Sequence, residues 1–266
     1  MLIKELTNKY VSKGLNLNNA RNLAAEEILL TRIASSSLSD SITLKGGIVM
    51  YRISKNDRRV TQDIDFDFIR YSIDKKSIEL FVDKLNENDD FLFEINGNIE
   101  ALHQEDYRGV RVNLIIKDQT NAQLRIKLDI GVHTYTAIEQ EKVLFSFERT
   151  DKEIMLKVNP CEQIFAEKVL SLARLGVLST RYKDIYDIYY IISNNMLNVE
   201  TVRKTLNLYF DNAKRKPKNI YELQDSISYV LSDANYSREA SKPAFKWIDA
   251  EYSSVAKTII DYINKL

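Results

Sequence analysis

The segment from Asp63 to Phe68 alternates an aspartate with an apolar residue at every step. Strict alternation predicts a half-buried β-strand, because successive side chains of a strand point to opposite sides. The apolar side chains would enter a core and the acidic ones would line the other face: Ile64, Phe66 and Phe68 against Asp63, Asp65 and Asp67. The chain must therefore form a sheet with at least one covered face.

The aspartates on this strand favour a cation on their face of the sheet. Asp63 and Asp65 would lie roughly 6.6 Å apart along the strand, where their charges repel. A divalent cation relieves that repulsion, and hard oxygen ligands suit Mg²⁺ or Mn²⁺. The alternative is a solvated face whose charges only prevent pairing with another strand edge.

Two adjacent glycines upstream strengthen the prediction of a ligand site. Gly46-Gly47 follows Lys45 and precedes an apolar segment from Ile48 to Ile53, an order typical of strand, tight turn and short helix. Paired glycines let backbone N–H groups approach a ligand closely, and a helix N-terminus favours phosphate. The chain has only 7 glycines in 266 residues, so an adjacent pair is unusual for it.

A second alternating segment, Leu124 to Ile130, supplies another carboxylate. Arg125, Lys127 and Asp129 would share the face opposite the apolar residues. Asp129 is then either a ligand on a neighbouring strand or the partner of a lysine or arginine.

Lys168 lies in the apolar stripe of a helix predicted from about Pro160 to Leu175. A lysine there either extends its ammonium group to solvent or points at an anion, since an unpaired charge among apolar groups is costly. If the anion is a bound ligand, Lys168→Met should keep or raise thermal stability while abolishing activity.

Three blocks of the sequence resemble the nucleotidyltransferase superfamily, and more closely the AbiEii family of nucleotidyltransferase-like toxins from bacterial toxin–antitoxin systems. The blocks are Lys45 to Met50, Arg59 to Phe66, and Ala166-Glu167-Lys168 with Arg181 to Asp187. They follow the family's order and cover roughly residues 42–190. One departure is Ile48, which stands where the family usually has a hydroxyl residue. Any contact of that hydroxyl with a triphosphate would pass to backbone groups or another side chain.

The resemblance implies roles for individual residues. The implied metal ligands are Asp63, Asp65 and Asp129, and the last would also orient or deprotonate the acceptor hydroxyl. The implied catalytic set adds Lys168 and Asp184, the latter positioning substrate or the lysine. The residues expected to contact the nucleotide are Lys45, Gly46, Gly47, Arg59, Thr61 and Arg181.

The amino-acid composition excludes some classes of protein. Lys+Arg and Asp+Glu are 38 each, so a nucleic-acid partner would have to meet a local basic patch, such as the loop at residues 214–218. The single cysteine, Cys161, excludes an internal disulfide framework and suits a reducing compartment. No signal peptide or apolar run of membrane-spanning length is present, and we expect a cytoplasmic protein.

Other elements follow from periodicity and capping residues. Residues 1–18 read as an irregular or partly helical lead-in. We expect helices at 19–34 (capped by Asn18 or Asn19), 75–86, 160–175, 181–194 (capped by Ser179 or Thr180), 199–210, 220–231 and 250–263. We expect strands at 91–95 and 99–102, separated by a turn at 96–98, and another at 107–116.

The sequence therefore predicts an α/β (α+β) protein with a mixed-sheet nucleotidyltransferase-type domain at 1–155. A helical bundle at 156–266 would complete an active-site cleft. By resemblance, the function is Mg²⁺-dependent transfer of a nucleotide from an NTP to an acceptor such as tRNA. The protein would be the toxin of a toxin–antitoxin or phage-defence system and would have a cognate antitoxin. An NTP-dependent phosphotransferase, a metal-dependent nuclease and a non-catalytic nucleotide-binding module are the alternatives.

Overall fold

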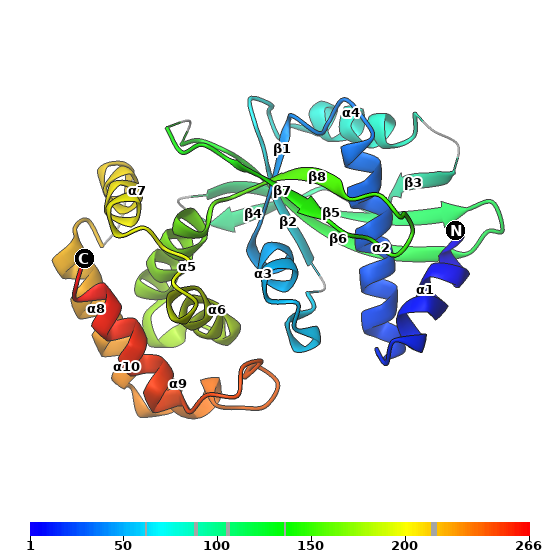
Figure 1. The fold of residues 1–266 in the computed structure, drawn as a ribbon. Coiled ribbons are helices and arrows are strands. Elements are labelled where there is room, and N and C mark those ends of the chain that lie inside the picture. Colours follow the sequence, from blue (N-terminus) through cyan, green and yellow to red (C-terminus); the bar gives the residue numbers. More distant parts are fainter. Residues whose placement is uncertain (62, 88–89, 105–106, 136, 214–216) are drawn as a thin grey trace. The chain divides into compact units, whose positions relative to one another are not determined.

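The computed structural model describes residues 1–61, 63–87, 90–104, 107–135, 137–213 and 217–266, so most of the predicted basic loop lies outside the described residues. The chain divides into two compact units, Met1–Asn159 and Pro160–Leu266 (Figure 1). The first combines a sheet with helices, and the described part of the second has helices without strands. The predicted α/β class is confirmed. No helix in these ranges has the length and apolar character needed to cross a membrane.

The described residues of the first unit form an eight-stranded mixed sheet. Its strands are β1 (Ile42–Lys45), β2 (Asp63–Phe68), β3 (Phe91–Ile95), β4 (Glu100–Gln104), β5 (Tyr107–Asp118), β6 (Gln123–Val132), β7 (Glu141–Phe145) and β8 (Ile154–Val158). The order is β3-β5-β6-β2-β1-β8-β7, with β4 also paired to β5. The pairs β2–β6 and β1–β8 are parallel and the others antiparallel. The strand of alternating aspartates, β2, thus lies in the interior of the sheet.

The strands on either side of the turn at 96–98 do not pair with each other. β3 pairs with the C-terminal half of β5, and β4 pairs with its N-terminal half. β5 has 12 residues whereas β3 and β4 have 5 each, so one edge of β5 accommodates both short strands. β7 and β8, which the sequence analysis did not anticipate, extend the sheet beyond β1.

The described residues of the first unit also form four helices: α1 (Ile3–Ser12), α2 (Leu17–Ala34), α3 (Gly46–Ser54) and α4 (Lys75–Leu85). A short 3₁₀ turn, Asp57–Arg59, precedes β2. α2 packs on β6 and β8, and its residues are buried without interruption from Leu23 to Ile33. The predicted caps of this helix were wrong, because the side chain of Asn16 accepts the backbone N–H of Asn19 and the helix begins two residues earlier.

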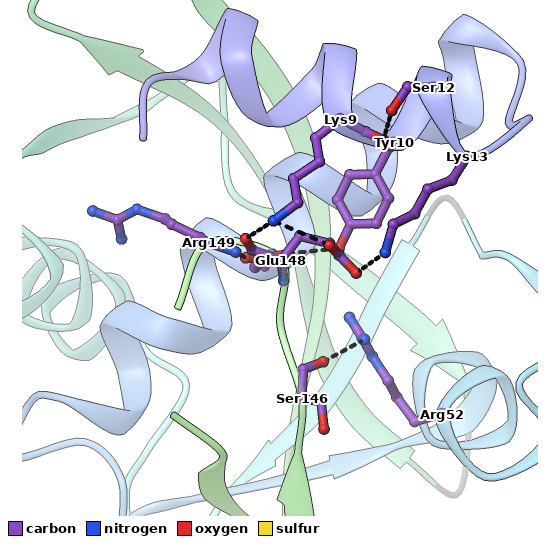
Figure 2. Close-up of polar contacts among 9 residues, drawn as sticks. Lys9, Tyr10, Ser12, Lys13, Arg52, Ser146, Glu148 and Arg149 are labelled. Atoms are coloured by element: carbon purple, nitrogen blue, oxygen red, sulfur yellow. Dashed lines mark hydrogen bonds and ion pairs between the residues drawn. The ribbon is translucent and has the colours of Figure 1, made fainter. Parts of the chain in front are cut away.

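A buried carboxylate on α2 joins α1 to the connection between β7 and β8. Glu27 accepts the hydroxyl of Tyr10 at 2.5 Å and the backbone N–H groups of Glu148 and Arg149. Figure 2 shows Lys9 of α1 reaching Glu148 from the outside, with the ammonium 3.3 Å from the carboxylate. These contacts satisfy a carboxylate that has no exposure to solvent, as a buried charge requires.

A second carboxylate on α2 holds α3, the helix that follows the glycine pair. Arg52 of α3 donates its Nε to Glu26 at 3.0 Å, and its guanidinium also approaches the carbonyl of Ser146 (Figure 2). Burial raises the pKa of Glu26, and the charge of Arg52 opposes that shift. The far end of α3 is thereby tied to the central helix of the unit.

The second unit is a helical bundle. Its helices are α5 (Cys161–Leu175), α6 (Tyr182–Ser193), α7 (Val199–Asn212), α8 (Ile220–Ser232), α9 (Ala234–Ala240) and α10 (Tyr252–Ile263), with a 3₁₀ turn at Gly176–Leu178. α5 packs against α6, α7 and α8. The predicted stripe of α5 is buried except for Leu175, which is exposed. α6 begins with Arg181 at the N-cap, without a side-chain cap, so the predicted Ser179 or Thr180 cap was wrong. The short α9 was not anticipated.

Candidate active site

Strand pairing brings four charged residues into one row across the sheet. Lys45 of β1 lies opposite Asp65 of β2, Asp65 lies beside Asp129 of β6, and Asp129 lies opposite Arg111 of β5. Paired residues on neighbouring strands point to the same face of a sheet. The alternation of β2 and β6 therefore directs this row away from the core formed by Ile64, Phe66 and their neighbours.

Cations accompany the carboxylates on this face. The ammonium of Lys127 lies 2.6 Å from Asp63, and the ammonium of Lys45 lies 2.7 Å from the buried Asp67. The guanidinium of Arg111 donates to both oxygens of Asp129, each at 2.8 Å. A two-point contact of this kind fixes the plane of the carboxylate.

The glycine pair is required by the side chains packed against it. Gly46 has φ +64°, and a Cβ there would overlap the carboxylate of Asp65. A Cβ on Gly47 would lie 3.0 Å from both the guanidinium of Arg59 and the hydroxyl of Thr61. The predicted nucleotide-contacting residues of the first unit, Lys45 included, are therefore assembled around the start of α3.

The N-terminus of α3 faces this cluster with backbone N–H groups that no helical carbonyl can accept. Ile48 is fully buried and contributes to the core, so its side chain has no polar atom to offer a ligand. At this position only the backbone can donate to an anion. The expected tight turn between strand and helix is absent among these residues, because β1 ends at Lys45 and α3 begins with the glycine pair itself. Helix N-termini of this kind favour phosphate.

The donor chemistry of the face fits a hard divalent cation. Asp63 and Asp65 are partly buried carboxylates on one side of β2. Mg²⁺ is often held by one or two carboxylates, with water and substrate phosphate completing its shell. Within the described ranges, no three acidic, histidine or cysteine side chains converge as a ready-made ligand group. Asp129 is engaged by Arg111, which matches the alternative stated for it.

The second unit carries a separate charged cluster. Lys168 of α5 is buried, with its ammonium 2.5 Å from Asp184 and 2.8 Å from Asp187, both on α6. Asp187 is fully buried and accepts the indole N–H of Trp247 at 3.1 Å. The lysine is therefore neither extended to solvent nor without an anion in its own chain. Arg181 is exposed at the start of α6, and its backbone N–H bonds the Ser179 hydroxyl.

The predicted residues thus fall into two groups, one in each unit. Those in the first unit are Lys45, Gly46, Gly47, Arg59, Thr61, Asp63, Asp65 and Asp129; those in the second are Lys168, Arg181 and Asp184. Sequence reasoning missed four participants: Arg111, Lys127, Asp187 and Trp247. Strand alternation had already put Lys127 on the acidic face. The partners of Asp129 and Asp187 depend on pairing between distant segments, for which a single sequence carries no signal.

The site combines a strand that carries carboxylates with the N-terminus of a helix that begins with two glycines. The sequence motifs indicate this arrangement for a nucleotidyl transferase. The family model described as nucleotidyl transferase AbiEii toxin, type IV TA system, matches residues 28–251, and the chain belongs to that family. No protein of curated function matches it.

Proposed function

We propose that this protein transfers a nucleotidyl group from an NTP to an acceptor hydroxyl with the help of Mg²⁺ or Mn²⁺. The observation that supports this most directly is the packing of Gly46 on Asp65. Through this packing, a helix N-terminus, which can bind phosphate, lies against a carboxylate, which can bind a cation. An NTP bound with its metal presents both chemical groups together.

In this proposal the first unit binds the metal–triphosphate complex. Asp63 and Asp65 would hold the metal ion, whose charge would stabilise the charge that develops on the phosphate oxygens. Backbone N–H groups at Gly46 and Gly47, with Lys45, Arg59 and Thr61, contact phosphate. The phosphate contacts fix the position of the α-phosphate for attack.

Asp129 is the residue we assign to the acceptor. Arg111 holds its carboxylate in one plane, with the remaining lone pairs of the oxygens available. The acceptor oxygen forms a bond to the α-phosphorus, the bond to the pyrophosphate breaks, and the hydroxyl proton passes to Asp129 or to solvent. By resemblance to the family, Asp129 would also be a third ligand of the metal, although the three carboxylates do not converge in this structure.

The second unit contributes the remaining assigned residues. Lys168 and Arg181 would bind the triphosphate, and Asp184 would orient Lys168, which it contacts. The charge of Lys168 is already paired with two carboxylates. Arg181 is therefore the stronger candidate for direct contact with phosphate.

The family suggests the biological setting. We propose a toxin that acts in the cytoplasm, uses an RNA acceptor such as tRNA, and is neutralised by a cognate antitoxin; a role in phage defence is part of the same proposal. Membership of the toxin family supports the toxin role and the existence of an antitoxin partner.

Incubation with labelled NTPs and total cellular RNA tests the reaction. We expect label from the α-phosphate to be retained on RNA, and Asp65→Asn to reduce that retention by at least about 10²-fold, because it removes a charge that the transition state needs. The matched control is Asp83→Asn, an exposed aspartate on α4. Label retained only from the γ-phosphate would instead mean phosphoryl transfer. RNA shortening without NTP would mean a nuclease, and binding without turnover would mean a nucleotide-binding module.

A further inference from the structure

The only tryptophan of the chain is bound to the buried end of the Lys168 cluster. Trp247 lies in the segment between α9 and α10 and is almost fully buried. Its indole N–H donates to one oxygen of Asp187 at 3.1 Å, and the other oxygen of Asp187 lies 2.8 Å from the ammonium of Lys168. The indole N–H thus bonds one carboxylate oxygen, and the ammonium lies beside the other.

Exposure increases along this line of contacts. The Asp187 side chain is 0% exposed, that of Lys168 is 9% exposed and that of Asp184 is 16% exposed. The inner end is thus enclosed by protein, and the outer end reaches the surface of the unit. A lysine side chain has four rotatable bonds, so its ammonium needs partners that hold it in place. The enclosed Asp187 restricts it more than the partly exposed Asp184 does.

The tryptophan is itself held in place by α6. Its ring packs on Tyr190 with centroids 5.4 Å apart, and Phe245, two residues earlier, packs on Tyr182 at 4.9 Å. Tyr182 and Tyr190 lie on either side of Asp187 along the helix. The segment is therefore attached to α6 at two points, which fixes the direction of the indole N–H.

We propose that Trp247 is a positioning residue for the transfer reaction, acting through Asp187 on Lys168. This inference rests on the proposed function and deepens it. The indole N–H selects the orientation of Asp187 in which its second oxygen faces Lys168. Loss of that hydrogen bond removes one restraint on the Asp187 carboxylate, and the ammonium between Asp184 and Asp187 is then held less firmly in place. Trp247 does not contact substrate in this scheme.

Trp247→Phe removes the N–H and keeps an aromatic ring. The matched control is Tyr252→Phe, which removes the hydroxyl that Tyr252 donates to the carbonyl of Leu231 in the same unit, 3.0 Å away. We expect Trp247→Phe to lower kcat about 10-fold to 100-fold, with the KM for NTP changed less than about threefold, because misplacement of an aligned group costs rate more than binding. The control should keep kcat within about twofold. Equal kcat values for the two variants, at comparable melting temperatures, would overturn the inference.

A spectroscopic measurement tests the same link without turnover. A protein labelled with ¹⁵N-tryptophan gives a single indole N–H resonance, since the chain has one tryptophan. We expect Lys168→Met to shift this resonance, because the charge on the far side of Asp187 changes. Lys204→Met, an exposed lysine on α7, should leave it in place. An unmoved resonance in Lys168→Met would overturn the link. If the wild-type protein transfers no nucleotide, the proposed function fails, and the resonance still decides whether Trp247 responds to Lys168.

Discussion

At the scale of single residues, Gly46 is restricted both by its backbone conformation and by the side chain packed against it. Its φ of +64° strains any side chain, and its missing Cβ leaves room for the Asp65 carboxylate. We expect Gly46→Ala to lose about 1–2 kcal/mol of stability from the backbone alone and to abolish transfer, because Asp65 must move. Denaturant unfolding and NTP labelling measure the two effects.

Gly14→Ala is the control that shows the effect of backbone strain alone, without displacement of the Asp65 carboxylate. Gly14 also has positive φ, +95°, but open space surrounds its missing Cβ. This variant should lose stability and keep full labelling. Retained turnover in Gly46→Ala would show that contact with Asp65 has no bearing on the reaction.

The contacts of Lys168 reverse one expectation from the sequence. The expectation that Lys168→Met would keep or raise stability took a bound triphosphate as the partner of the lysine, whereas Asp184 and Asp187 pair with it within the second unit. Removing the ammonium leaves the fully buried Asp187 without its cation, which costs about 3–5 kcal/mol at such sites. We expect a clear fall in melting temperature, partly restored by adding Asp187→Asn. A variant as stable as the wild type would mean that water replaces the lysine.

At the scale of elements, a carboxylate at the end of β5 ties the first residue of α1 to the sheet. Asp118, at the end of β5, accepts the backbone N–H of Ile3 at 2.9 Å and bonds to Thr120 and Ala122. Burial raises the pKa of Asp118, but these hydrogen bonds outweigh it and hold the pKa below its ordinary value of 3.8. A carboxyl group with a lowered folded-state pKa contributes stability above pH 3.8 that is lost as pH falls through the folded pKa.

Asp118→Asn tests this attachment. We expect the variant to be about 1–3 kcal/mol less stable than wild type at pH 7, because hydrogen bonds to a charged group become neutral ones. The difference should shrink as pH falls below 3.8, because the carboxyl group of the unfolded wild-type chain then binds a proton, and it should vanish once pH passes the lower pKa of the folded state. Urea unfolding from pH 7 to pH 3 measures it, with Asp83→Asn as the exposed control. A constant difference across that range would exclude the charge as the cause.

The elements that the sequence predicted well are those with strong local periodicity. β2, β6, α4 and α5 followed the expected ranges closely, and their apolar faces are buried with the exception of Leu175. The errors arose where contacts between distant segments determine the structure. β3 pairs with β5, which is long enough to hold a second short strand on the same edge. The cap of α6 is an arginine where a serine or threonine was expected. Periodicity gives the face on which Asp63, Asp65 and Asp129 lie, but not the ion pairs of Asp63 with Lys127 and of Asp129 with Arg111.

At the scale of the whole molecule, two units with separate cores each carry part of the proposed machinery. The family match spans both of them, from residue 28 to 251. The glycine pair and the carboxylate face belong to the first unit, and the Lys168 cluster to the second. Motif spacing located both groups along the chain. It did not reveal that the second group is stabilised by a tryptophan more than fifty residues beyond its last aspartate.

The parallel pairing of β2 with β6 has a consequence for synthesis of the chain. Asp65 and Asp129 become neighbours only after α4, β3, β4 and β5 have all been made, because these elements lie between them in sequence. Trp247 leaves the ribosome later still. On a nascent chain, the row that contains Asp65 and Asp129 can therefore assemble before the Lys168 cluster acquires its tryptophan, so the second unit is the later of the two to be completed.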